Sequence, residues 1–292
     1  MTEIRAMPVE AAGVRTSVLR GGPGRDPVLF LHGGVPALSP YCGGAHLWSG
    51  YLELAARERE ILAPDLPGFG DTPAPEPYRI DALGRFALAL IEALKLGRCH
   101  VVGHDEGGLI AIGMALEAPA AVRSVTVIAS PTAAPSGDSV ESPVLANPPR
   151  PPWSRATQAW ALERLSYNRH HVDGALLDRC AAAAEAEPHR RAIAAADKQQ
   201  NSLAASAAAT KARLYAHCRE RAFPVPAQIV WASHDPLAPV ERGLALFRVA
   251  AERQPAAHFH VINRAGHFPF REEPEAFHHV LAAFHDGLAA AV

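Results

Sequence analysis

The chain has 292 residues, of which 49% are hydrophobic and 20% are charged. This length supports a sizeable hydrophobic core, arranged as one domain with an inserted subdomain. The formal net charge of -2 provides no basic surface for nucleic acid, and no apolar run is long enough to predict a secretory signal or a membrane span. We therefore expect a cytoplasmic protein that binds a small molecule and neither nucleic acid nor membrane, and we leave open whether it forms a homodimer.

The cysteines and histidines predict neither a disulfide framework nor a metal site. Four cysteines are scattered along the chain without a CxxC pair, so we expect free thiols in a reducing compartment. Fifteen histidines are many, but no HExxH or similar spacing brings metal ligands together. We expect no metal and no cofactor.

Short apolar runs alternate with longer stretches of helical period in the first part of the chain. Strands are predicted at 28–31, 61–64, 99–102 and 125–128, and helices at 80–96 and 109–116. This alternation favours an α/β fold with a mostly parallel central sheet and helices on both of its faces.

The pattern changes after residue 130. Residues 131–152 are rich in proline, serine and small residues, which is typical of a linker or an extended excursion. Residues 153 to about 223 have helical period and no strand candidate, and strands return at 228–231 and 258–262. We therefore expect a core formed by residues 1–130 and 224–292, with residues 131–223 inserted as a helical cap, or lid, over the strand ends.

A glycine-rich turn joins the strand predicted at 99–102 to the following helix. In Gly103-His104-Asp105-Glu106-Gly107-Gly108, glycines stand two residues before and two residues after Asp105, which is the spacing of a nucleophile elbow. The central residue of such an elbow is strained, so its neighbours two positions away must lack side chains. The helix start adds main-chain N–H groups and the positive end of a helix dipole. The alternative is a tight turn in which Asp105 only caps the helix.

Three further motifs lie after predicted strands, in the chain order nucleophile, acid, histidine. Asp235 follows the strand at 228–231, and His267 follows the last strand. His32-Gly33-Gly34 follows the first predicted strand, where an oxyanion donor is expected. We predict a triad of Asp105, Asp235 and His267, with the main-chain N–H groups of Gly34 and Glu106 as oxyanion donors.

Together these motifs resemble the α/β-hydrolase superfamily over nearly the whole chain, with a cap inserted after the strand at 125–128. Aspartate at the elbow is similar to the branch of epoxide hydrolases and haloalkane dehalogenases. The segment 31–34, with Gly43-Gly44 and Trp48 downstream, instead resembles carbon–carbon hydrolases that act on ring-cleavage products. Those enzymes carry serine at the elbow, so the two resemblances imply different chemistries.

The identity of the central residue determines the expected reaction. Aspartate, with an ordinary pKa of about 3.9, is ionised at neutral pH and can attack an sp³ carbon to form an ester. His267, oriented by Asp235, would then activate the water that cleaves this ester. Glu106 would repel a halide leaving group, so the main expectation is a hydrolase similar to epoxide hydrolases, acting on a small apolar substrate.

Other functions stay open. One is a dehalogenase. Another is an enzyme similar to carbon–carbon hydrolases, or a lyase-like or other non-hydrolytic enzyme, in which Asp105 acts as a base. A third is a ligand receptor without catalysis.

The resemblance to epoxide hydrolases also implies two cap tyrosines that protonate the epoxide oxygen. Tyr167 and Tyr215 are candidates in the insert, and Tyr41 lies in the loop after the oxyanion glycines; packing is the alternative role for each. The residues expected to bind substrate are His32, Tyr41, Trp48, His104, Trp160, Tyr167 and Tyr215.

Overall fold

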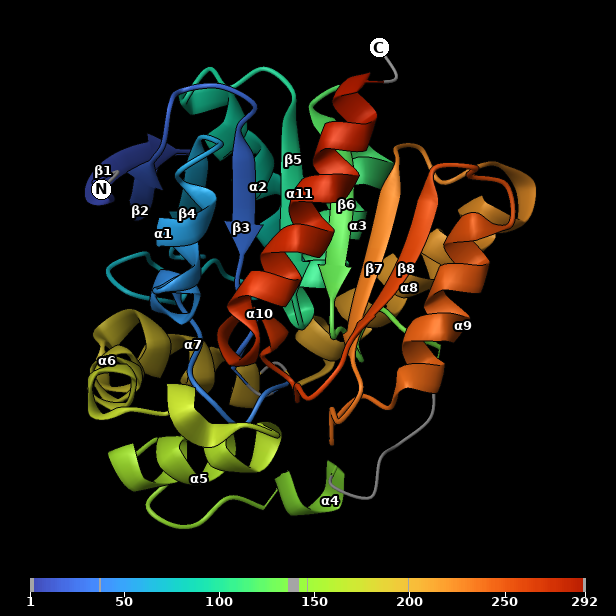
Figure 1. Cartoon of the computed structure of the whole chain (residues 1–292). Coiled ribbons are helices and arrows are strands. Elements are labelled where there is room, and N and C mark those ends of the chain that lie inside the picture. The colour runs from blue at the N-terminus through green and yellow to red at the C-terminus, as the bar shows by residue number, and fades with distance from the viewer. Residues whose placement is uncertain (1–2, 37, 136–141, 146, 199, 291–292) are drawn as a thin grey trace.

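The computed structural model describes residues 3–36, 38–135, 142–145, 147–198 and 200–290. Its sheet has the strand order β1-β2-β4-β3-β5-β6-β7-β8 (Figure 1). The strands are β1 Arg5–Ala11, β2 Val14–Gly21, β3 Val28–Leu31, β4 Ile61–Pro64, β5 Cys99–His104, β6 Val122–Ile128, β7 Ala227–Ala232 and β8 Ala257–Ile262. Strands β3 to β8 pair in parallel, whereas β1 and β2 pair antiparallel. The mostly parallel sheet predicted from the sequence is therefore confirmed.

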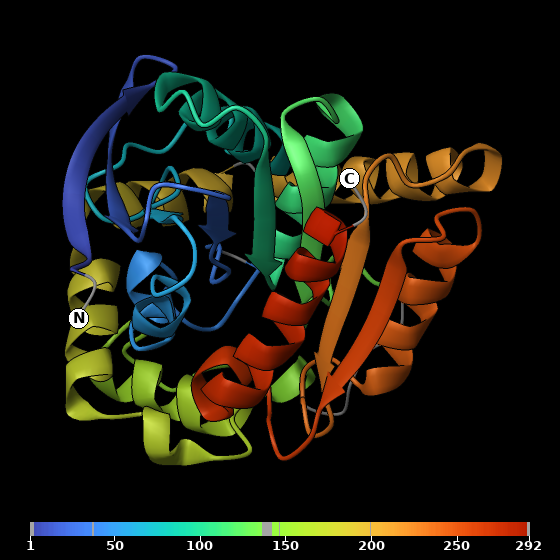
Figure 2. The same cartoon turned by 45° about the horizontal axis from the view of Figure 1, so that its top comes forward.

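Helices cover both faces of this sheet. The helices of the described residues are η1 Ala45–Trp48, α1 Tyr51–Ala55, α2 Ile80–Ala93, α3 Glu106–Glu117, α4 Ser142–Leu145, α5 Arg155–Leu165, η2 Arg169–His171, α6 Gly174–Glu185, α7 Glu187–Lys198, α8 Gln200–Glu220, α9 Val240–Ala251, α10 Pro269–Glu272 and α11 Pro274–Ala290. In Figures 1 and 2, α11 crosses one face, and Figure 2 shows the twist of the sheet from β1 at one edge to β8 at the other.

The central strands separate two hydrophobic layers because successive side chains point to opposite faces. Leu29 and Leu31 of β3 belong to the layer that contains α2, α3 and α9, whereas Val28 and Phe30 belong to the layer of α1 and α11. All four β3 residues are buried. Such a run without polar residues is typical of a parallel strand covered on both faces, which is why the sequence predicted these strands well.

The N-terminal hairpin and two helix boundaries differ from the prediction. No strand was predicted before residue 28, yet β1 and β2 form one edge of the sheet. Helix α3 begins at Glu106, three residues before the predicted start, because tertiary packing overrides the low helix propensity of Gly107 and Gly108. Helix α2 ends at Ala93 rather than at 96, and Lys95 has a positive φ of 53° that ends the helical path.

The described residues between β6 and β7 contain helices and no strand of the sheet, in agreement with the helical period. Figure 1 shows α4, α5, α6 and α7 beyond the ends towards which the parallel strands point. Helix α8 instead packs against α2, α3 and α9. Part of the predicted linker forms α4, while residues 136–141 and 146 lie outside the described residues. The division into a core and a cap at 131–223 stays a prediction.

The helices, the possible metal ligands and the cysteines were each compared with the expectations from the sequence. Within the described ranges, no helix has the length and hydropathy needed to cross a membrane. The same ranges hold no group of three or more histidine, cysteine or acidic side chains placed to share a metal ion. The four cysteines are free and buried.

Several histidines are buried as neutral side chains, because burial lowers their pKa. It lowers the pKa of His32 and His189 to about 4, and that of His46, His100, His104 and His171 to about 3. The pKa of His285 is also lowered, first by burial and then by His100, whose ring is stacked 3.9 Å away. An unfolded chain protonates each of these rings as the pH falls through about 6.5, whereas the folded chain does not until the pH is several units lower.

This difference predicts a loss of stability in mild acid. The contribution is complete above pH 6.5 and falls as the pH is lowered, by at most about 2 kcal/mol for each group at pH 5. We expect the urea midpoint of the wild type to drop between pH 7.5 and pH 5, and to drop less in His285→Phe. The control is His279→Phe, which changes an exposed histidine on the same helix. Equal pH dependence in both variants and the wild type would contradict the prediction.

Candidate active site

Asp105 stands directly after β5 in a left-handed conformation, with φ 53° and ψ -121°. A Cβ atom on Gly103 would lie 2.1 Å from the carbonyl oxygen of Gly107, so the chain tolerates only glycine there. The Asp105 N–H donates to the carbonyl of Ile128 at 3.0 Å, and the Ser130 hydroxyl donates to the Asp105 carbonyl at 2.6 Å. These contacts hold the strained turn of the predicted elbow.

The three residues predicted as a triad come together at the carboxyl ends of the strands. His267 Nε2 lies 3.5 Å from Asp105 Oδ2, and His267 Nδ1 lies 2.9 Å from Asp235 Oδ2. The second oxygen of Asp235 accepts the N–H groups of Leu237 and Ala238 at 2.9 and 3.0 Å, which fixes the carboxylate. All three side chains are buried, with Asp105 only 1% exposed.

The imidazole of His267 lies between the carboxyl groups of Asp105 and Asp235, and each of these groups changes the pKa of its neighbour. Burial alone would lower the pKa of His267, but Asp235 and Asp105 outweigh it and raise that pKa to about 10. Burial would raise the pKa of Asp105, but the contact with His267 outweighs it and lowers that pKa. At neutral pH these shifts favour the charged forms of both His267 and Asp105, so an imidazolium faces the Asp105 carboxylate.

Two hydroxyl groups hold one oxygen of Asp105. Tyr41 and Ser39 each donate to Asp105 Oδ2 at 2.9 Å. Asp105 Oδ1 is buried and accepts no hydrogen bond from the described residues. Tyr41 was predicted to bind substrate; the structure shows its hydrogen bond to Asp105, and the contact with substrate stays a prediction. Ser39 was not predicted, although its place in the loop between the oxyanion glycines and Tyr41 was a usable signal.

The predicted oxyanion hole is occupied by a side chain of the chain itself. Glu106 Oε2 accepts the N–H of Gly34 at 3.0 Å and the N–H of Val35 at 3.2 Å. Gly34 is therefore not a free donor towards substrate in this structure, which corrects the expectation. The cause is the position of Glu106 at the start of α3, from which its side chain reaches back to the loop after β3. The Glu106 N–H lies in the first turn of α3, where N–H groups have no partner within the helix.

Three of the predicted substrate-binding side chains are fixed by contacts within the core. His32 Nε2 accepts the N–H of Leu66 at 3.1 Å, and its Nδ1 lies 2.8 Å from the carbonyl of Gly33. His104 Nε2 lies 2.8 Å from the carbonyl of His267. Trp48 is fully buried and packs on an aromatic ring of α10 with 4.2 Å between ring centroids. These contacts support positioning and packing roles.

The tyrosines of the insert do not contact Asp105. Tyr167 is 51% exposed, and its ring lies 4.2 Å from that of His234. Tyr215 donates its hydroxyl to the carbonyl of Ala133 at 3.0 Å. Neither is arranged to protonate a substrate oxygen at Asp105, in contrast to the expectation from epoxide hydrolases.

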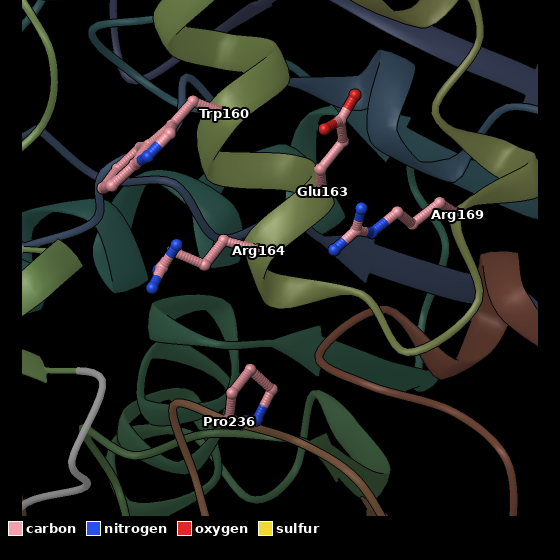
Figure 3. Close-up of a pocket in the computed structure, with 5 residues that line it drawn as sticks. All are labelled: Trp160, Glu163, Arg164, Arg169 and Pro236. Atoms are coloured by element: carbon pink, nitrogen blue, oxygen red, sulfur yellow. The ribbon is translucent and has the colours of Figure 1, made fainter.

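Trp160, also predicted to bind substrate, lines a pocket of about 320 Å³ where α5 faces the loop after β7 (Figure 3). The lining residues are Trp160, Glu163, Arg164, Arg169 and Pro236. Pro236 directly follows Asp235, so the pocket lies next to the loop that supplies the acid of the predicted triad. Arg164 lies over the ring of Trp160 at 5.7 Å from its centroid.

A buried carboxylate joins the segment after α5 to the loop that carries His267. Glu272 accepts the main-chain N–H of Asn168 at 2.8 Å, and those of Gly266 and Phe268 at 3.0 and 3.2 Å. Gly266 and Phe268 flank His267, so one side chain sets the position of both segments.

With this geometry the chain can be compared with known proteins. Residues 26–274 match the alpha/beta hydrolase fold family. The chain belongs to this family. Among curated hydrolases, it is 31% identical over 122 residues to 2-hydroxymuconate semialdehyde hydrolase of Pseudomonas sp. (strain CF600), and this match covers 41% of each chain. The aligned region thus spans about two fifths of that relative's length.

Two longer similarities cover nearly the whole α/β hydrolase fold. The chain is 24% identical over 273 residues to 2-hydroxy-6-oxononadienedioate/2-hydroxy-6-oxononatrienedioate hydrolase of Paraburkholderia phymatum, covering 90% of this chain and 88% of the relative. Among solved structures, 2-hydroxy-6-oxo-6-phenylhexa-2,4-dienoate hydrolase from Rhodococcus sp. strain RHA1 superposes with a TM-score of 0.77 at 20% identity, covering 97% and 99% of the two chains. The structural likeness supports the fold.

The role of Glu272 leads to a prediction about stability. Glu272→Gln replaces one acceptor oxygen by an amide group that faces main-chain N–H groups, so we expect a loss of about 1–3 kcal/mol in the free energy of unfolding. Hydrogen exchange at 166–168 and 266–268 should accelerate in the same variant. The control is Glu275→Gln, which changes an exposed residue at the start of α11. A loss equal to that of the control would show that Glu272 does not hold the two segments together.

Proposed function

We propose that this enzyme hydrolyses a carbon–carbon bond beside a carbonyl group in a small acidic substrate, and that Asp105 acts as a general base where related hydrolases use a serine nucleophile. The observation that carries this proposal is the placement of Glu106 in the predicted oxyanion hole. An acyl intermediate on residue 105 would form and break down through two successive oxyanions that need those N–H groups, whereas direct attack by water passes through one. With the hole filled, the group left at the centre is a carboxylate base beside an imidazolium.

The proposed reaction uses these two groups in sequence. Asp105 accepts a proton from water at Oδ1, and the resulting hydroxide attacks the carbonyl carbon, whose oxygen becomes an oxyanion. The oxyanion re-forms the carbon–oxygen double bond as the carbon–carbon bond breaks. When the carbon–carbon bond breaks, its electron pair stays on the leaving carbon, which takes a proton from the His267 imidazolium. Asp105 then returns its proton to His267. Direct attack by Asp105 on a carbonyl is disfavoured because it would give a labile anhydride.

The pocket and the relatives both support an acidic substrate. The names of the relatives describe hydroxylated oxo acids and a semialdehyde. Arg164 and Arg169 line the pocket next to the Asp235 loop, and guanidinium groups bind carboxylates well. Both support a substrate that carries at least one carboxylate.

A second candidate is an epoxide hydrolase that forms an ester on Asp105. It is favoured by Oδ1, which has no partner among the described residues, and by the charges around His267. Forming an ester would remove the Asp105 charge, so His267 would lose one of the groups that raise its pKa and become a base only after attack. The placement of Tyr167 and Tyr215 speaks against this candidate.

The two candidates are separated by a substrate panel combined with mass spectrometry. We expect turnover of 2-hydroxy-6-oxo-2,4-dienoates with different substituents at carbon 6. Asp105→Asn and His267→Gln should each lower turnover by about 100-fold or more. The control is Asp71→Asn, which removes an exposed aspartate.

The same variants are then incubated with terminal epoxides of several sizes. The base mechanism predicts no covalent product on either protein. A stoichiometric mass increase at Asp105 in His267→Gln, with epoxide turnover by the wild type, would establish the second candidate instead. Dienoate turnover by Asp105→Asn within about tenfold of the wild type would refute a role for Asp105 as base.

A further inference from the structure

The Glu106 carboxyl group makes contacts that the proposed reaction does not yet use. It is buried, and its Oε2 accepts the N–H groups of Gly34 and Val35. Its other oxygen, Oε1, lies 2.9 Å from the hydroxyl oxygen of Ser39. That hydroxyl oxygen is also 2.9 Å from Asp105 Oδ2. One serine hydroxyl thus bridges two buried acidic side chains.

The single hydrogen of the Ser39 hydroxyl favours one neutral and one ionised acid in this arrangement. A serine hydroxyl has one hydrogen to donate, and a carboxylate has none. If Asp105 and Glu106 were both carboxylates, the one hydrogen of Ser39 would be divided between two negatively charged acceptors, which weakens both contacts. One of the carboxyl groups therefore carries a proton and donates it to Ser39.

The surroundings assign this proton to Glu106. Asp105 Oδ2 faces the His267 imidazolium and accepts from Tyr41, so its negative charge is balanced. Glu106 receives two neutral N–H groups, both on Oε2, which leaves Oε1 to hold the hydrogen. The pKa values agree: burial first, and then the charge of Asp105, raise the pKa of Glu106 well above its ordinary range.

We propose that Glu106 is held as a neutral carboxylic acid in the oxyanion hole and shares its proton with Asp105 through the hydroxyl of Ser39. In the transfer, the O–H bond of Glu106 Oε1 breaks as its proton binds Ser39 Oγ, and the original Ser39 hydrogen binds Asp105 Oδ2. The negative charge moves from Asp105 to Glu106. The N–H groups of Gly34 and Val35 then stabilise it as they would a substrate oxyanion.

Through this relay Asp105 can be protonated or ionised without exchanging a proton with bulk water. Asp105 can take a proton from water when Glu106 is neutral, and can present an acidic hydrogen when Glu106 is charged. Its use in turnover rests on the proposed function, but the shared proton itself rests only on the contacts of the resting enzyme. Ser39 and Glu106 are therefore assigned as positioning residues that act through Asp105.

Infrared spectroscopy of the enzyme without substrate tests the shared proton. A neutral carboxyl group has a carbonyl stretch that is separate from carboxylate bands and shifts in D₂O. We expect the wild-type spectrum minus that of Glu106→Gln to contain this band at neutral pH. The matched control is Glu60→Gln, since Glu60 is also buried but is paired with Arg20, and its difference spectrum should lack the band. Absence of the band from the Glu106 difference spectrum overturns the proposal.

Three further variants test the path of the proton. Ser39→Ala should shift the frequency of the Glu106 band because its acceptor is lost, and Ser39→Thr should restore it. Asp105→Asn removes the neighbouring charge, so the band should disappear at a lower pH than in the wild type. A frequency unchanged in Ser39→Ala, or a titration unchanged in Asp105→Asn, refutes the relay. These spectra need no substrate, so they test the relay even if no dienoate is turned over. They also test it if Glu106→Gln does not fold.

Discussion

The main chain of β5 ends in a left-handed turn at Asp105, and the arrangement of the site follows from this turn. The carbonyl of Asp105 is held by Ser130, and close main-chain approaches at Gly103 and Gly107 leave no room for side chains. Within this turn, residue 105 projects towards His267, while residue 106 begins α3 and projects towards the loop after β3. Two acidic side chains that are adjacent in sequence thus reach two different parts of the site.

The consequence is a site in which most carboxylate oxygens have fixed partners, while Asp105 Oδ1 has none among the described residues. His267 lies between Asp105 and Asp235, and the second acid, Glu106, is stabilised by main-chain N–H groups. A pair of ionised carboxylates at this depth would be costly without further cations, so the neutral state of Glu106 is the low-energy arrangement. The enzyme holds this arrangement before substrate binds, so little reorganisation is needed when charge develops.

The sequence predicted the parallel strands and the places of Asp105, Asp235 and His267 at strand ends because both depend on local patterns. Buried parallel strands such as β3 are continuous apolar runs, and the glycines around Asp105 mark a turn that tolerates no side chain. The order of Asp105, Asp235 and His267 along the chain then followed from the order of the strands.

The features that the sequence did not predict depend on contacts between distant segments. Strand β1 alternates exposed and buried residues at a sheet edge, so its apolar pattern is weak. Helix α8 looks like any alanine-rich helix, and only tertiary packing places it against α2 and α3. The bridge from Ser39 to Glu106 spans 67 positions and depends on where a side chain folds back. The place of Ser39 near the oxyanion glycines marks it as a candidate, but no periodicity or motif predicts its contact with Glu106.

The filled oxyanion hole also constrains how this site can change during evolution. A single substitution that placed serine at position 105 would supply a nucleophile while Glu106 still occupied the N–H groups of Gly34 and Val35. A single substitution that shortened Glu106 would empty the hole while residue 105 stayed a carboxylate. Each single variant would thus lack one part of either mechanism: the first has a nucleophile without free oxyanion donors, and the second has free donors without a serine nucleophile. We therefore expect the residues at positions 105 and 106 to change together, because either single substitution would give an enzyme of low activity on the same fold.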